Sequence, residues 1–192
     1  MSFKIRKATP ADCRAIAELA LMAGEGIPAF FWQQPGQDII DIGAKKACSE
    51  TDNFSYHNVH LAELNNEVAA MFLAYKLPEE DDTNLDELPE IIRPLIELEQ
   101  CVPGSFYINM IATYPQHRGK AVGTKLLGTV DQLAKAADCE LISLEVFEQN
   151  DGALRLYQRL GYNIIERRKV VPHECYPYTG DILLLTRARR DT

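Results

Sequence analysis

Long apolar runs are missing from this 192-residue sequence. No stretch approaches the roughly 20 apolar residues that a membrane-spanning helix needs, and residues 1–7 are not followed by the apolar run of a signal peptide. Basic residues are in the minority, with 20 Lys and Arg against 28 Asp and Glu and a formal net charge of −8. Because nucleic acids and anionic membranes are bound through a basic face, neither is expected as a partner.

Cysteine is scarce and follows no motif. The cysteines are odd in number, widely spaced and never in a C-x-x-C pair, so the sequence predicts neither a disulfide framework nor a zinc site. His57 and His60 have the spacing of metal ligands but lack a third ligand. We therefore expect no metal and, from the unpaired thiols, a reducing cytoplasmic location. The cysteines are Cys13, Cys48, Cys101, Cys139 and Cys175.

The pattern of apolar residues predicts a single α/β domain over residues 1–192, with a mixed sheet and helices on its faces. The Asn65-Asn66 pair predicts a hairpin turn, because asparagine tolerates positive φ. An acid-rich insertion at about 77–100 is expected to be helical. The other predicted helices are 10–23, 38–49, 122–137 and 151–160, and the predicted strands are 3–8, 59–64, 68–75, 105–113, 141–147, 162–168 and 182–186.

Residues 111–124, IATYPQHRGKAVGT, leave a predicted buried strand, pass through a basic loop and begin an amphipathic helix. Free N–H groups at a helix start bind anions, and residues 100–130 contain no Asp or Glu. This combination favours a phosphate-bearing ligand over a plain strand–helix turn. The P-loop spacing and the G-x-G-x-x-G dinucleotide fingerprint are both absent, so the loop alone does not identify that ligand.

Two motifs resemble those of the GCN5-related N-acetyltransferases (GNAT family). Residues 118–123, RGKAVG, are similar to motif A, [QR]-x-x-G-x-[GA], with Ala121 at the usual central glycine. Its methyl group either crowds the pyrophosphate or, if the residue is helical, is harmless. Residues 150–162, NDGALRLYQRLGY, match the second signature, N-x-x-A-x-x-x-Y-x-x-x-G-[FY], at every position. The resemblance is strong over 105–162. It implies a mixed, mostly antiparallel sheet splayed at the motif A strand, with helices on both faces.

The resemblance also implies acetyl-coenzyme A (acetyl-CoA) as co-substrate, and no metal. The splayed strand is expected to pair with the pantetheine arm, the loop amides to cradle the pyrophosphate, and Asn150 to contact the cofactor while capping its helix. Tyr157 is expected to protonate the departing thiolate, the alternative being an aromatic that anchors its helix. The implied cofactor-binding residues are Ile111, Ala112, Thr113, Arg118, Gly119, Lys120, Ala121, Val122, Gly123, Thr124, Asn150 and Tyr157.

The general base is not defined by either motif. Several family members carry a carboxylate where this chain has Tyr107, which is no ordinary base near neutral pH. Glu97 and Glu99, just before the motif A strand, are the candidates, with His117, His173 or a water chain as alternatives. The acids of the insertion predict a field that attracts cationic amines, unless they only keep a loop solvated.

These observations predict an N-acetyltransferase that moves an acetyl group from acetyl-CoA to a primary amine by direct attack in a ternary complex. The expected partner is a small-molecule or peptide amine, with a cationic acceptor and a homodimer both left open. Two alternatives remain at this point. One is an acyl-CoA sensor with the same fold and no acceptor chemistry, and the other is a protein or peptide acetyltransferase.

Overall fold

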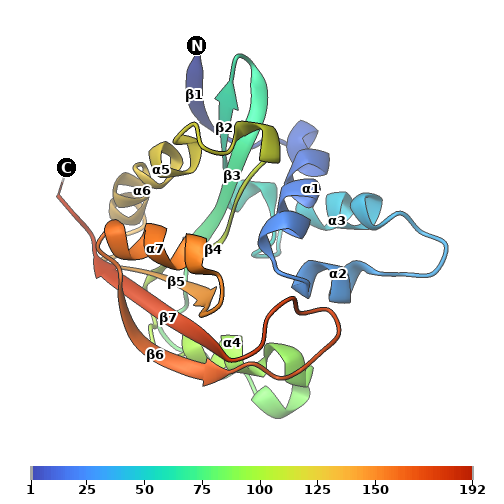
Figure 1. Ribbon diagram of the computed structural model, residues 1–192, viewed down its shortest axis with the longest axis vertical. Helices are drawn as coiled ribbons and strands as arrows, with labels where there is room; N and C mark the ends of the chain where they lie inside the picture. The colour runs from blue at the N-terminus through green and yellow to red at the C-terminus, as the bar shows by residue number, and fades with distance from the viewer. Residues whose placement is uncertain (1, 192) are drawn as a thin grey trace. The chain divides into compact units, whose positions relative to one another are not determined.

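The computed structural model describes residues 2–191, which include a seven-stranded sheet in the order β1-β2-β3-β4-β5-β7-β6 (Figure 1). The β4–β5 pair is parallel, whereas β1–β2, β2–β3, β5–β7 and β6–β7 are antiparallel. This confirms the predicted mixed, mostly antiparallel sheet. The strands are β1 (Phe3–Lys7), β2 (Val59–Leu64), β3 (Glu67–Lys76), β4 (Phe106–Thr113), β5 (Leu141–Phe147), β6 (Asn163–Lys169) and β7 (Asp181–Ala188).

The chain forms two compact units, which divide within β4. The first unit contains residues 2–75 and 109–130, and the second contains residues 76–108 and 131–191. The helices of the first are α1 (Cys13–Ala23), α2 (Ile27–Trp32), α3 (Ile39–Ala47) and α5 (Val122–Leu127). Those of the second are α4 (Arg93–Glu99), α6 (Val130–Ala136, which begins at the boundary) and α7 (Asp151–Arg159).

The core of the first unit lies where α1 and α3 pack together over β2 and β3. Trp32 is buried in it, and a Cβ at Gly43 of α3 would lie only 2.4 Å from the Trp32 ring. A glycine is therefore required for this close approach. The hairpin between β2 and β3 turns through Asn65 and Asn66 at φ 54° and 67°, which confirms the predicted turn.

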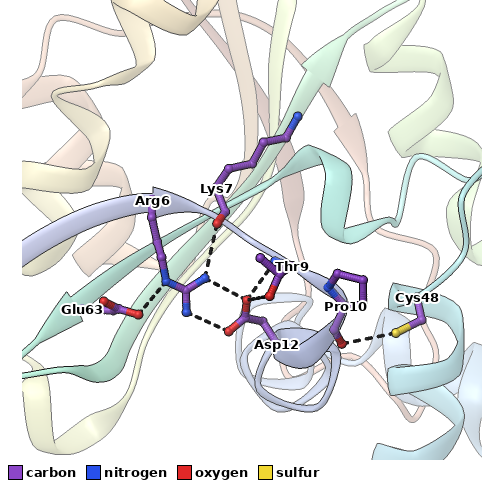
Figure 2. Close-up of polar contacts among 7 residues, drawn as sticks. All are labelled: Arg6, Lys7, Thr9, Pro10, Asp12, Cys48 and Glu63. Carbon is purple, nitrogen blue, oxygen red and sulfur yellow. Dashed lines mark hydrogen bonds and ion pairs between the residues drawn. The ribbon is translucent and has the colours of Figure 1, made fainter.

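A partly buried charge network fixes the start of α1 to the sheet (Figure 2). Arg6 Nη1 and Nη2 each donate to an Asp12 carboxylate oxygen at 2.8 Å, and Arg6 Nε donates to Glu63 at 2.6 Å. The N–H and hydroxyl of Thr9 also donate to Asp12, both at 2.8 Å. The hydrogen bonds from Arg6, followed by those from Thr9, lower the pKa of Asp12 to about 2 against the opposing effect of burial. Asp12 therefore stays ionised and holds β1 and β2 to the helix start.

One pair of cysteines is bonded, contrary to the sequence prediction. Cys13 at the start of α1 and Cys48 just after α3 form a disulfide, with their Cα atoms 5.7 Å apart. The prediction was wrong because the packing of α1 against α3 brings together residues 35 positions apart. Cys101, Cys139 and Cys175 are free thiols. The predicted cytoplasmic location therefore loses the support that it drew from unpaired cysteines.

The second unit places α4 against β6 and β7 (Figure 1). Only residues 93–99 of the insertion at 77–100 are α-helical, with two 3₁₀ turns before them, so its predicted helical character is confirmed only in part. The single helix predicted over 122–137 is wrong. Gly128 and Thr129 separate α5 from α6, and the Thr129 hydroxyl donates to the Leu126 carbonyl at 2.8 Å. In the described chain, no helix combines the length and apolar character needed to cross a membrane.

Candidate functional site

The parallel pairing of β4 with β5 is short. It joins Phe106–Ile108 to Ile142–Leu144, and β4 itself continues to Thr113. The predicted pantetheine-pairing residues Ile111, Ala112 and Thr113 lie on the continuing part of β4, in the first unit.

The loop after β4 brings two residues of positive φ to the start of α5. The N–H of Tyr114 donates to the Ala69 carbonyl at 3.0 Å, and a 3₁₀ turn follows. Gly119 and Ala121 then adopt positive φ, at 73° and 57°, before α5 begins. Lys125 donates its N–H to the Ala121 carbonyl at 3.0 Å. Helix geometry leaves the N–H groups of residues 121–124 without intrahelical acceptors, as the predicted pyrophosphate cradle requires.

Ala121 occupies the position where motif A usually has glycine, and its conformation explains that preference. Its φ of 57° and ψ of 18° are left-handed, so the right-handed helical conformation that would make the methyl group harmless is not adopted. A left-handed non-glycine residue costs roughly 1–2 kcal/mol. Ala121 therefore holds this backbone conformation at the expense of local strain.

Two basic side chains of the loop make contacts within the protein. Arg118 Nε donates to the Thr113 carbonyl at 3.2 Å, and Lys125 Nζ lies 4.7 Å from the centre of the Phe3 ring. Lys120 is exposed, as is the remainder of the Arg118 side chain. The loop thus offers backbone N–H groups and a modest positive charge to an anion.

The second signature forms α7 and its two ends, in the second unit. The Asn150 side chain caps the helix by accepting from the N–H of Ala153 at 3.2 Å. Gly161 stops the helix with a φ of 91°. Tyr157 is buried, and its ring packs edge-on against that of Tyr162 with the centroids 6.0 Å apart.

Glu97 and Glu99, the two candidate bases, have different environments although both lie on α4. Glu97 accepts from Arg168 Nε of β6 at 2.7 Å, an ion pair that ties α4 to the sheet. Glu99 instead lines a cavity of about 120 Å³ together with residues of the segment after β3, Asp81 among them. Burial and, secondarily, the negative charge of Asp81 raise the pKa of Glu99 to about 7, while the Tyr107 hydroxyl opposes the rise. A carboxylate with this pKa is suited to accept a proton near neutral pH.

Glu145 was missed by the sequence analysis, which also dismissed Tyr107. Glu145 lies on β5 with both carboxylate oxygens buried, and burial followed by the charge of Glu99 raises its pKa well above the usual range. Tyr107 is buried on β4 and interacts with both carboxyl groups. One signal was available: Glu145 is the only charged residue in the predicted strand LISLEVF.

His173 and His57 have ordinary structural contacts, whereas the buried Nδ1 of His117 has no hydrogen-bond partner. His173 Nδ1 accepts from the N–H of Cys175 at 3.1 Å in the loop between β6 and β7. His117 is buried in the loop after β4, and His57 Nε2 lies 3.0 Å from Glu50. In residues 2–191, no group of three or more His, Cys, Asp or Glu is arranged to hold a metal ion.

The chain belongs to the acetyltransferase (GNAT) family, whose sequence profile matches residues 23–162. The spermine/spermidine N(1)-acetyltransferase of Bacillus subtilis is 35% identical over 60 residues, which are 31% of this chain and 40% of that protein. The chain therefore aligns with less than half the length of this curated relative.

Solved structures of acetyltransferases share the fold over nearly the whole chain. The polyamine N-acetyltransferase of Drosophila melanogaster, which forms N-acetylagmatine, has a TM-score of 0.69 at 16% identity, covering 97% of this chain and 100% of that one. A Salmonella typhimurium protein described as a putative acetyltransferase, solved with acetyl-CoA, has a TM-score of 0.61 at 18% identity, covering 100% and 96%. At these identities the likeness establishes the fold.

Proposed function

We propose that residues 1–192 form one acetyltransferase domain that transfers the acetyl group of acetyl-CoA to the primary amine of a small cationic acceptor. The observation that carries the proposal is Glu99, which is half-buried, lines a cavity and has a carboxyl pKa raised to about 7. The family supplies the reaction class. The relatives named as acting on spermine, spermidine and agmatine favour a small polyamine-like acceptor.

Different residues of this chain bind the cofactor, accept a proton and donate a proton in the proposed reaction. The N–H groups of residues 119–124 and the exposed Arg118 and Lys120 side chains bind the pyrophosphate, while the β4 backbone at 111–113 pairs with the pantetheine arm. Glu99, rather than Glu97, accepts a proton from the acceptor ammonium, which leaves a neutral amine able to attack the thioester carbonyl. The thiolate that leaves takes a proton from the Tyr157 hydroxyl.

A cationic acceptor agrees with the charge around Glu99. Glu79 and Asp81 line the same cavity as Glu99, and an acidic surround attracts ammonium groups and raises their local concentration. The nearby guanidinium of Arg168 is already paired with Glu97 and Glu166, at 2.7 and 3.3 Å. Glu79 is paired with Lys76 at 2.8 Å, so the negative charge available to a substrate is that of Asp81 and of ionised Glu99.

Acetyl-CoA is expected to stabilise the folded protein, because a ligand that binds only the native state adds to the free energy of unfolding. At ligand concentrations about 100-fold above Kd, the gain is roughly 3 kcal/mol, or several degrees in Tm. Thermal melts with acetyl-CoA, CoA and dephospho-CoA measure it. No shift with any of the three would contradict the assignment of the loop.

The Ala121→Gly variant provides the matched control for that measurement. Glycine adopts the left-handed conformation without strain, so the variant is expected to bind acetyl-CoA as tightly as the wild type or more tightly. A large loss of affinity on this change would contradict the account of Ala121 as a strained left-handed residue that glycine can replace.

A further inference from the structure

The last turn of α7, which carries Tyr157, ends in a Schellman cap. The N–H of Tyr162 donates to the Tyr157 carbonyl at 3.1 Å, and the N–H of Gly161 donates to the Gln158 carbonyl at 3.0 Å. These are the two hydrogen bonds of that cap, and Gly161 supplies the left-handed residue that it needs. The contact between the rings of Tyr157 and Tyr162 accompanies them. The cap therefore fixes the two tyrosines relative to each other, so that a group holding Tyr162 and the helix end also holds Tyr157.

The carbonyl of Leu160, at the end of the same helix, is bound by an arginine that follows β7. A helix leaves its last carbonyls without intrahelical donors, and its C-terminal end carries a partial negative charge. Arg190 Nη2 donates to the Leu160 carbonyl at 2.6 Å. The backbone N–H of Arg190 donates to Asp131 Oδ1 at 2.8 Å. Through this one residue, the end of α7 is joined to a side chain of α6.

Asp131, in the first turn of α6, also binds Arg187 of β7. Arg187 Nη1 and Nη2 donate to the two Asp131 carboxylate oxygens at 2.6 and 2.9 Å, and both side chains are buried. The Arg187 guanidinium carbon lies 5.0 Å from the centre of the Tyr162 ring. A buried ion pair adds little net stability, because the cost of desolvating two charges offsets their attraction. Its effect here is geometric, since bidentate pairing fixes the plane of the guanidinium beside that ring.

We propose that Asp131, Arg187 and Arg190, together called the clamp, are positioning residues for Tyr157. All four residues lie in the second unit. Arg190 holds the carbonyl at the end of the helix, Arg187 holds the ring of the capping tyrosine, and Asp131 holds both arginines. The Tyr157 hydroxyl donates a proton in the proposed reaction, and such a step depends steeply on the position of the donor. The catalytic meaning of the clamp rests on the proposed function, whereas its hold on the helix end does not.

Amide hydrogen exchange measured on the full chain tests that hold without reference to activity. Arg190→Met changes an exposed side chain, so the variant is expected to fold. The amides of Leu160 and Tyr162 should exchange roughly 3- to 10-fold faster, the factor for the loss of one hydrogen bond. The amide of Leu154, which donates to the Asn150 carbonyl at the start of α7, should keep its rate. Arg190→Lys should restore the slow exchange, because an ammonium group can also donate to the last carbonyls of a helix.

The double variant Asp131→Leu/Arg187→Met tests the effect on the chemistry. It removes both charges of the buried pair, so neither is left unpaired and the protein is expected to fold. We expect kcat to fall by roughly 10-fold and the KM for acetyl-CoA to change less. Added to Tyr157→Phe, the double variant should cause no further loss, because the hydroxyl that it misplaces is already absent. Asp181→Leu/Arg167→Met, the same changes in the ion pair at the opposite end of β7, is the control and should keep kcat.

The outcomes separate the clamp from the proposed function. Unchanged exchange at Leu160 and Tyr162 in the folded variants would overturn the clamp, as would an equal loss of kcat with and without the Tyr157 hydroxyl. Faster exchange confined to the helix end, with a loss of kcat only where that hydroxyl is present, supports both the clamp and the acid role. If exchange at the helix end is faster but Tyr157→Phe alone keeps full turnover, the hold on the helix stands and the acid role fails.

Discussion

Replacing Glu99 with glutamine is expected to lower kcat/KM by roughly 10²- to 10³-fold at pH values above 7, the usual contribution of a positioned general base. Glutamine keeps the size of the side chain and removes its ability to accept a proton. In the wild type kcat/KM should rise with pH through about 7, because Glu99 must be ionised to act and its pKa is raised to about 7. The variant should lose this acid limb. Steady-state kinetics across the pH range measure both effects.

Glu97→Gln is the matched control for this experiment, since it makes the same chemical change two residues earlier on the same helix. Its carboxylate is paired with Arg168, so the variant should keep the acid limb and most of its activity. If Glu97→Gln and Glu99→Gln lose activity equally, or if neither does, Glu99 is not the base.

The Tyr157→Phe variant is expected to lower kcat by roughly 10²-fold, the low end for loss of a general acid. The KM for acetyl-CoA should change much less, because the hydroxyl matters mainly once negative charge develops on the sulfur. Pre-steady-state kinetics are used to establish that the chemical step limits turnover, so that the change in kcat between wild type and variant reports on that step.

Tyr162→Phe gives the aromatic control for that prediction. Its ring packs against Tyr157, and the Arg187 guanidinium lies 5.0 Å from its centre. Its hydroxyl has no hydrogen-bond partner, so its removal should leave turnover unchanged. Full turnover in Tyr157→Phe, with the chemical step limiting, would assign Tyr157 a purely structural role.

Features determined by neighbours in the sequence were predictable. The Asn65-Asn66 turn, the Asn150 cap and the Gly161 stop each depend on a few adjacent residues, and each has the expected geometry. Motif spacing likewise predicted a strand, a basic loop and a helix start between residues 111 and 124. Local conformational preferences are sufficient to specify such elements.

Features determined by distant contacts were not predictable. The Cys13–Cys48 disulfide depends on how α1 packs on α3. The choice between Glu97 and Glu99 depends on Arg168, which is 71 residues from Glu97. Residues two apart on a helix point in directions roughly 200° apart, so one carboxylate can meet β6 while the other lines the cavity. No periodicity in the sequence shows which of the two carboxylates pairs with β6 and which lines the cavity.

Acetyl transfer itself is the most direct test of the central claim. The purified chain is incubated with acetyl-CoA above pH 7 and a panel of spermidine, agmatine, a short diamine and an amine with a neutral tail. Free thiol and N-acetylated product are measured together. The account predicts equal amounts of thiol and acetylated amine, the highest kcat/KM for the cationic acceptors, and a decline of that preference as salt screens charges over about 8–10 Å. Binding of acetyl-CoA without acetylation of any amine in the panel would contradict the account and favour a sensor of acyl-CoA.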